Sequence, residues 1–303
     1  MKIRNISSVT LKKYILKTLI SFFRLLFCFA MCYMILKPFV SLILSAFMSP
    51  SDLLDIRVEK VPLKWSLYYW KGAWEGLGWS TAGLNSFITA SGVSILQVLT
   101  SVLVGYGLSR FKFKGSNLLL FGVVLTMIIP FQVYNISQYL TFRDFPIFGN
   151  LINTPWSMFI LSASCMGLKH GVYIYIVKTF FDGLPKEIEE AAYIDGAGIF
   201  KTFTSVMLPN VRNVIATIFL LSFSWQWTDT EFTGHLNNVV NTLPTRVTSS
   251  YMQMATVKSA QDILGTTIAQ GAAVILIILP LVVLYIFCQR SFMQSMSRSG
   301  LAN

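Results

Sequence analysis

Six apolar runs dominate the sequence, and each is about as long as a helix that crosses a lipid bilayer. The hydrocarbon layer is about 30 Å thick, which an α-helix spans in roughly 20 residues. The runs are Leu25–Phe47, Phe87–Leu108, Leu118–Ser137, Trp156–Val177, Pro209–Thr228 and Ile263–Cys288. Only 12% of the 303 residues are charged, and the mean hydropathy is +0.62. We therefore predict an all-α integral membrane protein with six transmembrane helices, and a soluble enzyme is excluded.

The runs divide the chain into three predicted parts. Residues 1–24 are basic and are expected in the cytoplasm or along the inner membrane surface. Residues 25–288 form the transmembrane domain, and residues 289–303 a cytoplasmic tail. The first run is longer than the apolar core of a secretory signal and has no A-x-A cleavage site after it, so we interpret it as a retained anchor.

The distribution of charge predicts the orientation. With the N-terminus inside, the predicted cytoplasmic segments hold 15 of the 24 Lys and Arg residues and the outer segments hold 7. Lys and Arg accumulate on the cytoplasmic side of membrane proteins, so both termini are expected there. The net charge of +11 is then a signal of topology, and no nucleic-acid partner is expected. All 13 Asp and Glu residues lie outside the six runs, which disfavours a proton-coupled pump.

The predicted cytoplasmic segment 181–212 has the pattern of two short helices joined by a turn. Helical spacing places Ala191, Ala192 and Asp195 on one face, where the small alanines would let another surface approach the backbone. Gly196 follows and is expected to form the turn, because glycine accepts a positive φ. The alternative is an ordinary loop that carries a surface helix.

The same segment resembles the EAA loop of ABC-importer permeases, whose pattern is EAA, three residues, Gly, nine residues, Ile, one residue and Leu-Pro. The matching residues are Glu190, Ala191, Ala192, Gly196, Leu208 and Pro209, with Val206 where the pattern has isoleucine. Asp195 lies within the stretch AAYIDGA, which is close to the commonest sequence of the loop.

Further motifs in colinear order, over roughly residues 10–300, are similar to carbohydrate permeases of the maltose-transporter MalG type. They include Tyr106–Gly115, Ile129–Gln132, Trp225–Asp229, Thr242–Pro244 and Gln289–Phe292. The chain departs from the family pattern at Gln226, where asparagine is common, and at Asn213, where proline is common.

This resemblance implies the permease fold of a type I ABC importer in a bacterial or archaeal cell membrane. It implies a second permease subunit, expected to be a different chain, and an extracellular or periplasmic solute-binding protein. Two cytosolic ATPase subunits would bind ATP and Mg and receive the EAA loop. The sequence itself has no phosphate-binding loop, catalytic set or metal-ligand cluster, so no catalytic site, metal or cofactor is expected in this chain.

Aromatic and amide side chains within the runs are the predicted lining of a sugar path. Sugars present apolar ring faces to aromatic groups and hydroxyls to fixed polar groups. The predicted residues are Gln132, Tyr134, Asn135, Gln138, Trp225 and Gln270. Anchoring at the membrane interface or bonding between helices is the alternative role for such residues. Two alternative functions stay open: an ABC permease for a solute other than a sugar, and a sodium-coupled secondary transporter.

Overall fold

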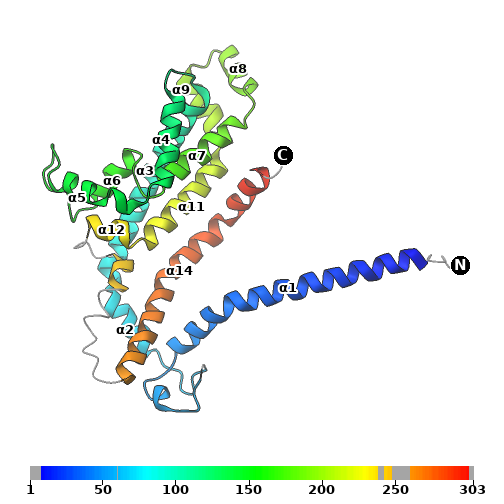
Figure 1. Cartoon of the computed structure of the whole chain (residues 1–303), viewed down its shortest axis with the longest axis vertical. Helices are drawn as coiled ribbons and strands as arrows, with labels where there is room; N and C mark the ends of the chain where they lie inside the picture. Colours follow the sequence, from blue (N-terminus) through cyan, green and yellow to red (C-terminus); the bar gives the residue numbers. More distant parts are fainter. Residues whose placement is uncertain (1–7, 60, 238–241, 248–259, 300–303) are drawn as a thin grey trace. The chain divides into compact units, whose positions relative to one another are not determined.

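The computed structural model describes residues 8–59, 61–237, 242–247 and 260–299 (Figure 1). In this part of the chain the regular structure is helical, apart from one isolated bridge between Phe145 and Gly149. The chain divides into two units. The first comprises Met1–Ala73 and Ala255–Ile275, and the second comprises Trp74–Met254 and Leu276–Asn303. The division falls inside helices α2 (Tyr68–Leu77) and α14 (Ala260–Ser299).

The first unit is built on the long helix α1 (Ser8–Ala46) and the beginning of α14. Helix α1 runs without a break through residue 24, so the expected boundary there is not a break in structure. Gly271 of α14 lies against α1, because a side chain at this position would meet the Leu42 methyl groups. Most of the apolar side chains that are described on α1 are exposed within this chain, as lipid contact requires.

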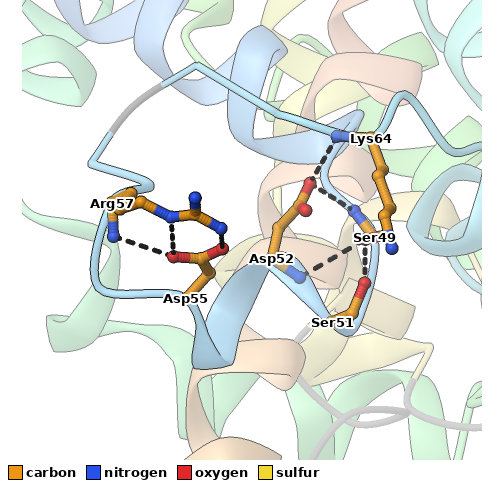
Figure 2. A network of polar contacts seen from close by, with 6 residues as sticks. All are labelled: Ser49, Ser51, Asp52, Asp55, Arg57 and Lys64. Atoms are coloured by element: carbon orange, nitrogen blue, oxygen red, sulfur yellow. Dashed lines mark hydrogen bonds and ion pairs between the residues drawn. The ribbon is translucent and has the colours of Figure 1, made fainter.

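A polar loop follows α1 and contains the 3-10 turn Asp52–Leu54 (Figure 2). The Asp52 carboxylate accepts the backbone N–H groups of Ser49 and Lys64, each at 3.2 Å, and so joins the two ends of the loop. Asp55 pairs with Arg57 at 2.7 Å. The hydrogen bond from the Arg57 guanidinium lowers the pKa of Asp55 to about 2.

The second unit is organised around α3 (Leu84–Arg110), which packs against α7 (His170–Asp182) and α11 (Arg212–Thr228) (Figure 1). Small and amide side chains lie on the buried face of α3, among them Ser94, Gln97 and Ser101. Such residues let membrane helices approach closely and bond to one another. Other α-helices of the unit are α4 (Ser116–Ile128), α5 (Asn135–Arg143), α6 (Trp156–Ala163), α8 (Glu187–Ile194), α9 (Ile199–Thr202), α10 (Leu208–Asn210) and α12 (Glu231–Leu236).

Among the described residues, three helices are long and apolar enough to cross a membrane: Leu16–Ala46, Trp79–Arg110 and Ile263–Gln289. They correspond to the first, second and sixth predicted runs. The pair Ile199–Asn210 and Arg212–Thr228 makes a fourth if this pair, which is bent by 73°, is one span. The structure thus contains three or four apolar spans.

The third and fourth predicted runs are not continuous helices. The third breaks after Ile128, because Pro130 lacks an N–H donor and holds the preceding Ile129 in an extended conformation. The fourth breaks between α6 and α7, where Cys165 and Lys169 have left-handed backbone conformations, with φ values of 65° and 57°. The polar pair Lys169-His170 interrupts the fourth run at this break.

Candidate functional site

Helices α8 and α9 with the turn between them form a knuckle at one end of the second unit (Figure 1). Gly196 lies in the turn with a φ of +81°. Its N–H donates to the Tyr193 carbonyl at 3.0 Å, and the Ala197 N–H donates to the Ala192 carbonyl at 2.9 Å. These two bonds around a left-handed glycine make a Schellman motif, which ends a helix while satisfying its last carbonyl groups. The structure therefore has the turn that the sequence predicted at Gly196.

The predicted docking face of α8 is divided in the structure. Glu190, Ala191 and Asp195 are exposed, whereas Ala192 is only 7% exposed and packs inside the chain. The expectation that both alanines share an accessible face is therefore wrong for Ala192. The reason is that Ala192 lies one helical turn after Glu189, which is also buried, so this side of α8 rests on the rest of the unit.

Large apolar side chains surround the exposed part of the knuckle. Ile194 is 86% exposed, Phe200 is 79% exposed and Ile199 is 58% exposed. They lie just before and just after the Gly196 turn, beside the exposed face of α8. A cluster of this kind beside charged residues is typical of a surface that binds another protein.

Glu189 is a site residue that the sequence analysis did not single out. Its carboxylate accepts a hydrogen bond from the Tyr106 hydroxyl at 2.9 Å and forms an ion pair with Arg110 at 3.0 Å. Arg110 also donates to the Leu184 carbonyl at 2.9 Å. Tyr106 and Arg110 belong to the final turns of α3, so this cluster attaches the knuckle to the central helix.

Leu208 and Pro209 lie on the other side of the knuckle, in the short helix α10. Leu208 is partly buried against the apolar core formed by α3, α7 and α11. Pro209 occupies the start of α10, where its missing N–H costs nothing. The Leu-Pro pair therefore leads into the bend before α11, and its partly buried leucine does not extend the exposed apolar cluster.

A second polar site is a cavity of about 470 Å³ within the second unit. It lies where α4 ends, where α7 begins and where α11 gives way to α12. Three of the predicted path residues line it: Gln132, Tyr134 and Trp225. The cavity exists because the third and fourth runs are broken, since both breaks contribute to its wall.

Charged groups meet the path residues in this cavity. The Gln132 amide donates to the Glu231 carboxylate at 3.2 Å. The Lys169 ammonium lies 5.1 Å from the centre of the Trp225 ring, which is a cation–π contact. Asp229 accepts the backbone N–H groups of Phe232 and Thr233 and so caps α12. Burial raises the pKa of Asp229 above its usual value.

The other predicted path residues lie elsewhere. Gln138 is buried beside a separate cavity of about 330 Å³, which Tyr134 also lines. The Asn135 carbonyl is bonded to the His235 ring at 2.6 Å. Gln270 belongs to the first unit. The structure therefore brings three of the six predicted residues into one cavity.

The apolar spans, the broken helices around a polar cavity and the exposed knuckle together define an all-helical membrane permease. A sequence model of the family described as "Binding-protein-dependent transport system inner membrane component" matches residues 97–298. The chain belongs to this family. It is therefore a multi-pass cell-membrane permease of a bacterial-type ABC importer, and the matching family is the membrane component of such importers and not their ATPase.

Two curated relatives show the range of the family. The chain is 28% identical over 236 residues to the maltodextrin transport system permease protein MdxG of Bacillus subtilis (strain 168). This alignment covers 78% of this chain and 80% of MdxG. It is 26% identical over 219 residues to the sn-glycerol-3-phosphate transport system permease protein UgpE of Yersinia pestis. That alignment covers 70% of this chain and 71% of UgpE.

A solved structure shares the fold. The match is to a chain from the crystal structure of a bacterial ABC transporter involved in the import of the acidic polysaccharide alginate. The TM-score is 0.68 at 20% sequence identity, and the match covers 95% of this chain and 99% of that one. At this identity the similarity establishes the fold alone.

Proposed function

We propose that this permease subunit imports a sugar or oligosaccharide and that its α8–α9 knuckle couples the partner ATPase subunits to the membrane helices. The maltodextrin permease among the relatives supports the sugar. The lining of the 470 Å³ cavity, with an exposed tryptophan beside amide and carboxylate groups, supports it as well. The glycerol-phosphate permease among the relatives keeps a non-sugar solute as the second candidate.

The observation that carries the coupling proposal is the exposed face of the knuckle. Ile194 and Phe200 expose most of their surface, which is unfavourable in water unless a partner covers it. Glu190 and Ala191 lie beside them and offer a charge and a close approach to the backbone. The family supplies only the membrane component of the importer, so the ATPase is the partner that this surface suits.

A mechanical path runs from the knuckle into the membrane. The Glu189 cluster holds α8 on Arg110 at the end of α3. Thirteen residues earlier on α3, Gln97 donates to the Leu168 carbonyl at the cavity wall. At 1.5 Å per residue the two contacts are about 20 Å apart along one continuous helix. A displacement of the knuckle by the ATPase would therefore reach the cavity through α3.

The proposed assembly has six spans in this chain, both termini in the cytoplasm, a second and different permease subunit, two ATPase subunits that bind ATP and Mg, and a solute-binding protein. Broken helices serve as spans where other helices or a cavity satisfy the freed backbone groups, which supports counting the third and fourth runs. Single cysteines at Ile147 and Glu190, in a chain without the native cysteines, test this topology. An impermeant thiol reagent outside intact cells should label position 147 and spare position 190.

The coupling role is tested by comparing Gly196→Asp with Gly149→Asp. Both glycines have a left-handed backbone, with φ values of +81° and +68°, and neither would bring a new Cβ within 4 Å of another group. The two variants therefore add the same charge and similar strain, but only one is on the knuckle. We expect Gly196→Asp to lose ATPase co-purification and binding-protein-stimulated ATP hydrolysis at normal abundance. Full activity of this variant would refute the coupling role.

A further inference from the structure

We infer that the cavity at the α4, α7 and α11 ends is a saccharide subsite whose charges select against anionic solutes, so that the transported saccharide carries no carboxylate, phosphate or sulfate group. The inference rests on the proposed sugar import and narrows its substrate class. It places a determinant of substrate selectivity in the cavity of this subunit.

The cavity extends to the depth of the middle of α3. Gln97 lies at the middle of α3 and donates to the Leu168 carbonyl at 3.1 Å, and Leu168 and Lys169 line the cavity. The cavity wall thus reaches the level of the centre of a spanning helix. Non-helical backbone at this depth is tolerated where it is buried in protein or lines a water-filled space. The breaks at Pro130 and Lys169 both line this cavity, as expected for a polar space at this depth.

The lining of the cavity carries more negative than positive formal charge. The ionisable side chains that line the cavity and carry a formal charge at neutral pH are one cation, Lys169, and two carboxylates, Asp229 and Glu231. Within the described part of the chain Lys169 has no carboxylate within 4.0 Å, and its ammonium lies over the Trp225 ring instead. The formal charge of the lining is therefore negative, and its cation lies against the Trp225 ring.

The side chains of the lining match the chemistry of a neutral sugar. Trp225 is 49% exposed and offers an aromatic face to a sugar ring. Glu231 can accept hydroxyl protons, and Gln132 can both donate and accept. A neutral sugar satisfies these groups, whereas a uronate or a sugar phosphate would place negative charge near two carboxylates. Like-charge contacts of this kind lower the affinity for the wrong ligand and so contribute to specificity.

The test measures the charge preference of the cavity without requiring the solute. Thr228 lines the cavity, is exposed, and makes its described hydrogen bonds within its own helix. A Thr228→Cys variant in a chain without the native cysteines is assembled with its partners in proteoliposomes. Its rates of reaction with a cationic and an anionic methanethiosulfonate are each divided by the rate with a free thiol. Ile147→Cys, which is 77% exposed and outside the cavity, is the control.

We expect the cationic reagent to react roughly threefold or more faster than the anionic reagent at position 228. At position 147 the two reagents should react at nearly equal rates. Glu231→Gln should reduce the preference at position 228, and Lys169→Met should increase it. Equal rates, a preference for the anion or an unchanged ratio in Glu231→Gln would overturn the inference. Identification of an anionic transported solute would do so as well.

The failure of this inference is distinguishable from failure of the proposed function. If position 228 shows no preference for the cation while Gly196→Asp abolishes coupled ATP hydrolysis, the importer stands and the substrate class is wrong. If the preference is present while Gly196→Asp retains full coupling, the cavity stands and the coupling knuckle is wrong.

Discussion

The Glu189 carboxylate on α8 lies 3.0 Å from the Arg110 guanidinium at the end of α3, and both side chains are at most 10% exposed. The pair joins two segments that are 79 residues apart in sequence and that the family resemblance treats as separate motifs. The Tyr106 hydroxyl adds a hydrogen bond to the same carboxylate. Of the three glutamates in the first turn of α8, one therefore holds the knuckle to the chain, while Glu187 and Glu190 face outward.

Removal of Glu189 should damage the knuckle more than removal of an exposed glutamate. Glu189→Ala leaves the Arg110 charge buried without its carboxylate, and breaking such a pair costs about 3–5 kcal/mol. We expect a lower melting temperature in detergent and weak ATPase capture. Glu187→Ala, which removes an exposed carboxylate of the same helix, should leave the melting temperature unchanged. Equal melting temperatures for Glu189→Ala and Glu187→Ala would show that the Glu189–Arg110 ion pair does not stabilise the chain.

The backbone at Gly196 makes a separate prediction about which side chains the turn accepts. Asparagine enters the left-handed region readily, whereas a β-branched residue there is strained. Gly196→Asn should therefore retain ATPase co-purification better than Gly196→Val, although both add bulk in open space. Gly198 is a matched control, since its φ of −74° is ordinary and Gly198→Val adds no such strain. Equal loss in the Asn and Val variants would show that bulk, rather than backbone geometry, matters.

Sequence reasoning predicted the features that depend on local chemistry. Three of the six apolar runs correspond to helices long enough to span a membrane, and the glycine at position 196 forms the turn, because hydropathy and φ preference act over a few neighbouring residues. The break at Pro130 was also within reach, since proline removes a donor and restricts the residue before it.

The remaining features depend on contacts between distant segments. No local signal pairs Glu189 with Arg110 or buries Ala192 while exposing Ala191. The Lys169 charge interrupts the fourth run, but a charge alone does not predict its left-handed backbone. No local signal indicates that the buried Gln97 bonds to the Leu168 carbonyl. For the same reason the sequence did not indicate which of the predicted path residues line one cavity, because the lining depends on where two helices break.

Gln97 should be a structural requirement of the cavity. Its amide donates to the Leu168 carbonyl, and its carbonyl oxygen accepts the Ser222 hydroxyl, so it joins α3 to the α6–α7 break and to α11. Gln97→Leu would leave both partners unsatisfied and should destabilise the chain by about 1–2 kcal/mol. The melting temperature should fall, and Thr228→Cys should change its rate of reaction with thiol reagents. Ser222→Ala removes one bond and should have a smaller effect; an effect as large as that of Gln97→Leu would argue against the bridge.

Asp229 should make the stability of the chain depend on pH in a specific direction. Burial raises the pKa of Asp229 in the folded chain, so the folded state holds this proton more tightly than the unfolded state does. Between the usual value of 3.8 and the raised value, the folded state binds more protons, and stability falls as the pH rises through this window. Asp229→Asn removes the titration but keeps an oxygen that can accept an N–H bond from the start of α12. As the pH falls from neutral into this window, the melting temperature of wild type should therefore rise relative to that of Asp229→Asn. Melting curves that stay parallel at all pH values would show that the Asp229 pKa is the same in both states.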